Sequence, residues 1–334
     1  MSIRYVESIN QALHEAMSRD ENVILIGEDI TDPYGGAFKA AKGISTKFPN
    51  QTFSSSISEQ AIVGLSVGAA LSGLRPVAEI MFADFIFLAS DQLINHAAKF
   101  PAMFNGLARV PMVVRTASGG GRGYGPTHSQ APEKHLLGVP GLRVVAPTPF
   151  HDPGAMLVSA IFNDDMPVVF IENKLFYGMA LRDEKTRGLW IDQVEDTNAH
   201  YPIARVRNFD PDKTSPDAIL VAISGAARQV EEALVSLARE EIWVEAYFPS
   251  ELNHASFDVV DQAVSRIGNV LFVEESTDGF GWSSEAIRQM VEKDITATMR
   301  VAYSAPGIIP AEKSMETAML VTPQQISNKI IELL

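Results

Sequence analysis

Cysteine is absent from this sequence of 334 residues. Without thiols the chain has no disulfide framework, no thiolate metal site, no cysteine-bound iron–sulfur cluster and no cysteine nucleophile. Long apolar runs are also missing, and the N-terminus lacks the apolar segment of a signal peptide. We therefore expect a cytoplasmic protein without a membrane partner.

Positive charge is scarce. Lys and Arg number 27 against 41 Asp and Glu, which gives a formal net charge of −14. Because nucleic acids bind to basic faces that release counterions, we expect no nucleic-acid partner. The histidines are scattered without metal-ligand spacing, and neither a G-x-S-x-G elbow nor a P-loop occurs. Acids and histidines at the ends of predicted strands are then the residues left for chemistry.

Apolar runs alternate with amphipathic segments in the first half of the chain. Helical spacing predicts a helix over 3–20, and the buried run "NVILIGEDI" predicts a strand over 22–30. Strands that alternate with helices predict an α/β fold with a doubly wound parallel sheet, which binds ligands at the carboxyl ends of its strands. The other predicted elements are helices over 59–74, 83–100 and 153–162 and strands over 75–82, 110–117, 143–149 and 166–173.

A polar, irregular stretch after this pattern indicates a domain boundary. We predict a first domain over 1–180, a linker over 181–215 and a second, smaller α/β domain over 216–334. The second domain is predicted to contain strands over 217–225, 242–249 and 269–276 and helices over 226–241, near 284–293 and near 322–333.

The loop "GGGRGYGPTHSQAPE", residues 119–133, combines glycines, prolines and a single histidine. Such a loop is either a solvated connection or a surface that comes close to a ligand. His128 is accordingly either incidental or an imidazole held at a site. Glu59, at the start of a predicted helix, either complements the helix dipole or belongs to the same site. A carboxylate and an imidazole across a cleft suit acid–base catalysis, but spacing alone leaves both alternatives open.

Four segments in order along the chain resemble one family: "SISEQAIVG", "EIMFADFIFLASDQLINHAAKF", "GPTHSQAPE" and "VVFIENKLFYG". They are similar to the β-subunits of thiamine-diphosphate-dependent 2-oxo acid dehydrogenases, and most of all to the E1 β-subunits of the pyruvate dehydrogenases. "TDGFGWSSEAI" and "SAPGIIPAEKSMETAMLVTPQQI" resemble the end of the same family, so the likeness covers about residues 3–333. The resemblance implies a transketolase-like pyrimidine-binding domain followed by a transketolase C-terminal-like domain.

The resemblance also implies catalytic and cofactor-binding residues. The glutamate that matches Glu59 bonds to the aminopyrimidine ring of the cofactor and stabilises the tautomer that removes the thiazolium proton. Phe85 matches the aromatic residue that stacks on the pyrimidine, and Ile57 and Met81 match residues of the same pocket. His128 matches the active-site histidine near the reacting carbon, which helps to bind substrate and to transfer the acyl group to lipoamide.

Further ligands and partners follow from the same resemblance. The family holds the diphosphate and magnesium with a G-D-G motif on a separate α-subunit, and this sequence has no G-D-G. The implied assembly is an α2β2 heterotetramer that docks on a lipoyl-bearing E2 acyltransferase. Asp164 and the backbone of Ala160 and Ile161 match a potassium site, although a plain helix-end aspartate is an equal alternative.

Three functions fit these residues. The first is the β-subunit of an E1 2-oxo acid dehydrogenase, an oxidoreductase that favours pyruvate over branched-chain 2-oxo acids. The second is the β-subunit of an acetoin dehydrogenase or an acyloin-forming enzyme, and the third is a catalytically silent scaffold subunit. Three departures from the family leave the potassium ion, the partner interface and the substrate open: "EAYFPSELNHASFD", the unusual details of the glycine-rich loop, and the extra residue in "FNDDMP".

Overall fold

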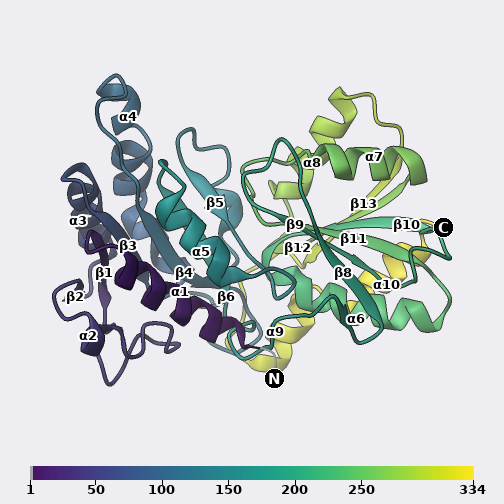
Figure 1. Cartoon of the computed structure of the whole chain (residues 1–334). Coiled ribbons are helices and arrows are strands. Elements are labelled where there is room, and N and C mark those ends of the chain that lie inside the picture. The colour runs from purple at the N-terminus through teal and green to yellow at the C-terminus, as the bar shows by residue number, and fades with distance from the viewer. Residues whose placement is uncertain (1–2) are drawn as a thin grey trace.

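Continuously apolar runs form the first sheet, as burial on both faces of a parallel sheet requires. Its strands are β1 (Val23–Glu28), β2 (Thr52–Ser55), β3 (Arg75–Ile80), β4 (Val113–Ser118), β5 (Arg143–Val145) and β6 (Val168–Asn173). The computed structural model, which describes residues 3–334, orders them β2-β1-β3-β4-β6-β5 with every neighbouring pair parallel. Figure 1 shows this sheet in purple to teal.

Helices cover both faces of this sheet. They are α1 (Tyr5–Arg19), α2 (Ile44–Lys47), α3 (Glu59–Leu71) and α5 (Pro153–Phe162). Alternate residues of a strand face opposite sides, so Leu25 belongs to the core that contains α1, α2 and α5, whereas Ile24 belongs to the core that contains α3. The predicted doubly wound parallel sheet is confirmed.

The prediction of one long helix over 83–100 is wrong. The chain instead forms a 3₁₀-helix, η1 (Ala83–Ala89), a π-helical segment, η2 (Gln92–Ala97), and the short α4 (Phe100–Met103). Asp84 explains the tighter first turn, because its carboxylate accepts hydrogen bonds from the backbone and the side chain of Gln130. This tertiary contact overrides the helical periodicity of the sequence.

The second sheet is mixed and receives strands from the predicted linker. Its strands are β7 (Lys185–Thr186), β8 (Leu189–Val194), β9 (Ile203–Arg207), β10 (Ala218–Ala222), β11 (Val244–Pro249), β12 (Asn269–Thr277) and β13 (Thr298–Ser304). They are ordered β13-β12-β10-β11-β9-β8-β7, and β7 to β9 pair antiparallel. Residues 181–215 are therefore not a plain connection. Their polar side chains alternate with buried ones such as Leu189 and Ile191, which hides the strands from a composition-based prediction.

Five helices accompany the second sheet among residues 3–334. They are α6 (Ala227–Arg239), α7 (Asp258–Ile267), α8 (Trp282–Glu292), α9 (Lys313–Met319) and α10 (Pro323–Ile331). The predicted helices at 226–241, near 284–293 and near 322–333 correspond to α6, α8 and α10, whereas the prediction omits α7 and α9. In this described part of the chain, no helix is long and apolar enough to cross a lipid bilayer.

Backbone hydrogen bonds join the two sheets near β5. The N–H of Ala146 donates to the carbonyl of Ser250 at 2.7 Å, and the N–H of Leu252 donates to the carbonyl of Val144 at 2.9 Å. The Arg143 guanidinium forms an ion pair with Glu251 across the same boundary. The two halves of the chain consequently lie side by side (Figure 1), and elements of the second half can reach the loops at the end of the first sheet.

Candidate active site

The carboxyl ends of the first sheet carry most of the predicted site residues. β3 is followed directly by Met81, and the turns of η1 then supply Phe85. β4 is followed by the glycine-rich loop that contains His128. Because all strands of the sheet run in one direction, these segments leave the sheet at the same edge, where α/β proteins bind their ligands.

Glu59 is the first residue of α3 and is only 5% exposed. The preceding Ser58 caps this helix, because its hydroxyl accepts a hydrogen bond from the N–H of Ala61 at 3.3 Å. Glu28, at the end of β1, lies within the electrostatic reach of Glu59. Burial and then the Glu59 carboxylate raise the pKa of Glu28. Glu28 is not among the residues that the sequence predicts for the site, although its position at a strand end is a usable signal.

His128 packs against two aromatic rings. Its imidazole meets the Phe82 ring edge-on at 4.7 Å and the Phe85 ring edge-on at 5.1 Å, measured between ring centroids. The Thr127 hydroxyl lies 3.0 Å from His128 Nδ1, which leaves Nε2 for another partner. The structure therefore brings together His128 and Phe85, which the sequence separates by more than forty residues.

The glycine-rich loop is held by carboxylates of the second domain. Glu275, on β12, accepts a hydrogen bond from the N–H of Gly120 at 2.6 Å, and Glu316, on α9, accepts one from the N–H of Gly123 at 2.6 Å. Gly119 has a φ of +90°, and a Cβ there would lie 2.1 Å from the amide nitrogen of Asn173. Glycine is thus required at this position by both backbone angle and space.

Lys174, which directly follows β6, supports the same loop. Its side chain is fully buried, and Nζ donates a hydrogen bond to the carbonyl of His128 at 2.7 Å. Burial lowers the pKa of Lys174 to about 8. Burial also raises the pKa of Glu275, which accepts a hydrogen bond from Asn173 at 2.9 Å. The sequence did not predict Lys174, Glu275 or Glu316 as part of the site. Two of them had a usable signal, since Lys174 directly follows an apolar strand and Glu275 lies near the end of another.

Several buried polar atoms at this edge have no hydrogen-bond partner among the described residues. They include Glu28 Oε2, Asp84 Oδ2 and Ser129 Oγ. Ile57, by contrast, is an apolar side chain that is 80% exposed, two residues before the helix that begins at Glu59. Unpartnered polar atoms beside exposed apolar surface are what a site built for a partly polar organic ligand presents.

Two of the three residues expected at a potassium site, Ile161 and Asp164, are engaged with arginines. The Asp164 carboxylate lies 2.6 Å from Nε of Arg143, and the carbonyl of Ile161 accepts a hydrogen bond from Arg75 at 2.7 Å. A hard cation needs several free oxygen ligands, and these two oxygens are taken. With Ile161 and Asp164 engaged in this way, the geometry does not favour a potassium ion at Ala160, Ile161 and Asp164, and the ion stays a prediction.

Glu133, the last residue of the loop, lies at the contact between the domains. Its side chain is buried, and the hydroxyl of Ser224, two residues after the end of β10, donates to its carboxylate at 2.5 Å. Burial is the main reason why the pKa of Glu133 is raised to about 7, and the carboxylates of Glu275 and Glu274 add to this effect.

We expect the stability conferred by Glu133 to fall as the pH rises. At or below about pH 4.5 the carboxyl is protonated whether the chain is folded or unfolded, whereas above pH 7 the folded protein must bury its charge. Glu133→Gln should therefore increase the free energy of unfolding at pH 8 by up to about 3 kcal/mol, and much less at pH 4.5. Urea unfolding of the unmodified protein and of Glu133→Gln from pH 4.5 to pH 8 measures this difference. The other titrating groups contribute equally to both proteins, so their effects cancel in the difference. Replacement of the exposed Glu15 by glutamine is the control. If Glu133→Gln and Glu15→Gln showed the same dependence of the free energy of unfolding on pH, the assignment to Glu133 would be contradicted.

Comparison with known proteins places this geometry in context. Residues 1–179 match the family model of the transketolase pyrimidine-binding domain, and residues 208–326 match that of the transketolase C-terminal domain. A solved structure titled "Split gene transketolase, inactive beta4 tetramer" superposes with a TM-score of 0.71 at 16% identity, over 100% of this chain and 99% of that chain. At this identity the likeness shows the fold, which is transketolase-like throughout.

Relatives of higher identity are subunits of dehydrogenases. The acetoin:2,6-dichlorophenolindophenol oxidoreductase subunit beta of Cupriavidus necator is 33% identical, over 91% of this chain and 85% of its own. The pyruvate dehydrogenase E1 component subunit beta of Acholeplasma laidlawii is 34% identical, over 87% and 85%. The 2-oxoisovalerate dehydrogenase subunit beta of Pseudomonas aeruginosa is 32% identical, over 87% and 83%. The chain therefore belongs to the family of E1 β-subunits of the thiamine-diphosphate-dependent pyruvate, acetoin and 2-oxoisovalerate dehydrogenases.

Proposed function

We propose that this chain, together with an α-subunit, decarboxylates a 2-oxo acid, with pyruvate favoured, and transfers the acyl group to the lipoamide of an E2 acyltransferase. The observation that carries this proposal is the meeting of His128 with Phe85 at the sheet edge where the buried Glu59 begins α3. A carboxylate, an aromatic face and an imidazole are the side chains that the reaction needs from a β-subunit.

Each of these residues has a distinct task. Thiamine diphosphate, when bound, supplies the electron sink for the loss of carbon dioxide from a 2-oxo acid. Glu59 would hold a proton on its carboxylate against the aminopyrimidine ring, and its burial strengthens that hydrogen bond. Phe85 would offer a ring face for stacking, and Ile57 and Met81 would line the same pocket. His128 would use Nε2 to orient the substrate and to move a proton during acyl transfer.

The partner proposal rests on exposed apolar surface. Large apolar side chains around α3, η1 and α4 are exposed to solvent in the isolated chain: Leu65, Leu88, Met103, Phe104 and Leu107. Contiguous exposed apolar residues mark protein interfaces, in keeping with a subunit of a larger E1 assembly. We propose a cytoplasmic α2β2 heterotetramer in which the α-subunit holds magnesium and the cofactor diphosphate. We also propose that the first domain of this subunit ends near residue 180.

Acetoin is the second candidate substrate. The Cupriavidus necator subunit named for acetoin is as similar to this chain as the subunits named for pyruvate, at 33% against 34% identity. Glu59 and His128 suit both substrates, because both reactions place an acyl group next to the same cofactor carbon.

The test is reconstitution with an α-subunit from the same genome. The α/β pair and each subunit alone are titrated calorimetrically with thiamine diphosphate and magnesium. Turnover is then measured with pyruvate, 2-oxoisovalerate and acetoin, using a lipoyl domain or dichlorophenolindophenol as acceptor. We expect cofactor binding only in the pair, and the highest kcat/KM for pyruvate with the lipoyl domain. Turnover of acetoin alone would select the second candidate, and absence of cofactor binding in every pair would support a scaffold subunit.

A further inference from the structure

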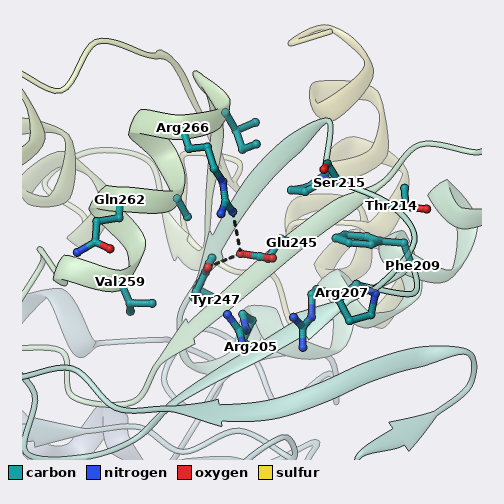
Figure 2. A pocket seen from close by; sticks show the side chains of 14 residues that line it. Arg205, Arg207, Phe209, Thr214, Ser215, Glu245, Tyr247, Val259, Gln262 and Arg266 are labelled. Atoms are coloured by element: carbon teal, nitrogen blue, oxygen red, sulfur yellow. Dashed lines mark hydrogen bonds and ion pairs between the residues drawn. The ribbon is translucent and has the colours of Figure 1, made fainter.

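A second cleft lies in the second domain, between one face of its sheet and α7. It has a volume of about 710 Å³ and is lined by Arg205, Arg207, Phe209, Glu245, Tyr247 and Arg266, among others. Figure 2 shows Arg266 extending from its helix towards Glu245, with Arg205 and Arg207 on the sheet below. This cleft is formed within the second domain and contains none of the residues proposed for catalysis.

The strand register explains why arginines gather here. Arg205 and Arg207 are two residues apart on β9, so both side chains leave the same face of the sheet. β9 pairs with β11 in such a way that Arg205 lies opposite Tyr247 and Arg207 opposite Glu245. Arg266 comes from α7 and approaches from the helix side. Three guanidinium groups thus enter one cleft from two walls.

Carboxylates neutralise only part of this charge. Asp192 on β8 serves both strand arginines, since its carboxylate accepts hydrogen bonds from Arg205 and from Arg207, the latter at 2.9 Å. Glu245 lies 3.8 Å from Arg266, which is an ion pair but too long for a hydrogen bond. Three guanidinium groups against two carboxylates leave one positive charge in a chain whose net charge is −14.

Donor groups are also left unused. Nε of Arg207 is buried and has no hydrogen-bond partner among residues 3–334. The side chain of Arg266 is 63% exposed. Its guanidinium group points towards the cleft and forms no hydrogen bond with a carboxylate. A buried guanidinium donor without a partner costs free energy, which a bound anion would recover.

We propose that this cleft binds a phosphorylated small molecule. A planar carboxylate is satisfied by a single guanidinium fork, whereas donors from two walls suit a tetrahedral phosphate, whose oxygens point in different directions. The hydroxyls of Thr214 and Ser215 line the same cleft and supply further donors. Phe209, Val259 and Ile267 provide apolar surface for the organic part of the ligand.

The test is calorimetric titration of the full-length chain at constant ionic strength. The probes are inorganic phosphate, AMP as a phosphate with an organic part, and acetate as a planar anion. We expect AMP to bind more tightly than phosphate and acetate to give no saturable heat. Arg266→Gln should weaken AMP binding by about tenfold or more, as expected when one charge-assisted contact is lost. Because Arg266 is largely exposed, this variant should fold normally, which thermal unfolding checks.

Arg239→Gln is the matched control. Arg239 is an exposed arginine at the end of α6, so the substitution removes the same charge without touching the cleft. Unchanged AMP binding in Arg239→Gln together with weaker binding in Arg266→Gln would support the proposal. Equal loss in both variants, acetate binding as tight as that of phosphate, or no saturable binding of either phosphate probe would overturn it.

Discussion

Replacement of Glu59 by glutamine is expected to lower the turnover of the assembled α/β enzyme by about 10²- to 10⁴-fold, the usual contribution of a general acid–base group. Glutamine keeps the size of the side chain and leaves the Ser58 cap of α3 in place, but it cannot share an acidic proton with the aminopyrimidine ring. Because the contact is made by one atom of a large ligand, cofactor affinity should fall much less than kcat. Steady-state turnover and calorimetric cofactor binding on the same preparations measure this split.

Glu15→Gln is the matched control for this prediction. Glu15 is an exposed residue of α1, so its replacement removes one carboxylate without touching the site. It should leave both kcat and cofactor binding as in the unmodified protein. If Glu59→Gln retained near-normal turnover in a correctly assembled pair, the catalytic role of Glu59 would be lost and the scaffold alternative would gain support.

The second large effect is expected for Arg115→Met in the core of the first sheet. Arg115 is 2% exposed and forms hydrogen bonds with both oxygens of Glu172, at 2.8 and 2.9 Å, and with Glu79 at 2.8 Å. Methionine fills the space but leaves the buried Glu172 and the largely buried Glu79 without a cation. We expect the free energy of unfolding to fall by about 3–5 kcal/mol, as is typical when one partner of a buried ion pair is removed. Urea unfolding at pH 7 measures this loss.

Two comparisons test whether buried charge causes the loss. Arg109→Met breaks an ion pair with Asp165 in which both side chains are largely exposed, so we expect a loss below about 1 kcal/mol. Adding Glu79→Gln and Glu172→Gln to Arg115→Met should restore much of the stability, because no charge is then buried alone. A triple variant as unstable as Arg115→Met would instead assign the loss to packing.

Much of the fold could be predicted because the pattern of apolar residues along the sequence reflects which segments are buried. The run Val23–Glu28 is apolar at nearly every position, and only a strand covered on both faces tolerates that. α7 was omitted although Asp258 at its start and Gly268 after its end are ordinary helix signals. β8 and β9 were hidden because their exposed sides carry charges. The 83–100 segment failed for another reason, since a contact with Gln130, distant in sequence, decides its geometry.

The residues of the candidate site also fall into two groups, those that the sequence predicts and those that it does not. Glu59, Phe85 and His128 could be predicted because each lies in a segment that resembles a family. Lys174, Glu275 and Glu316 could not, because their effect on the His128 loop depends on how the two domains pack, and no local pattern encodes that arrangement. Glu28 lay within reach of sequence reasoning, since it ends a buried strand at the edge where the site was expected.

The hydrogen bonds from Glu275 and Glu316 to the glycine-rich loop have a consequence for recombination between related genes. A chimaera joined near residue 180 would inherit the loop from one parent and its two carboxylate anchors from the other. Such a hybrid takes all the strands of each sheet from one parent, yet it is expected to hold His128 poorly unless both acids are carried along. Crossovers that preserve these three segments as a set should be enriched among active hybrids.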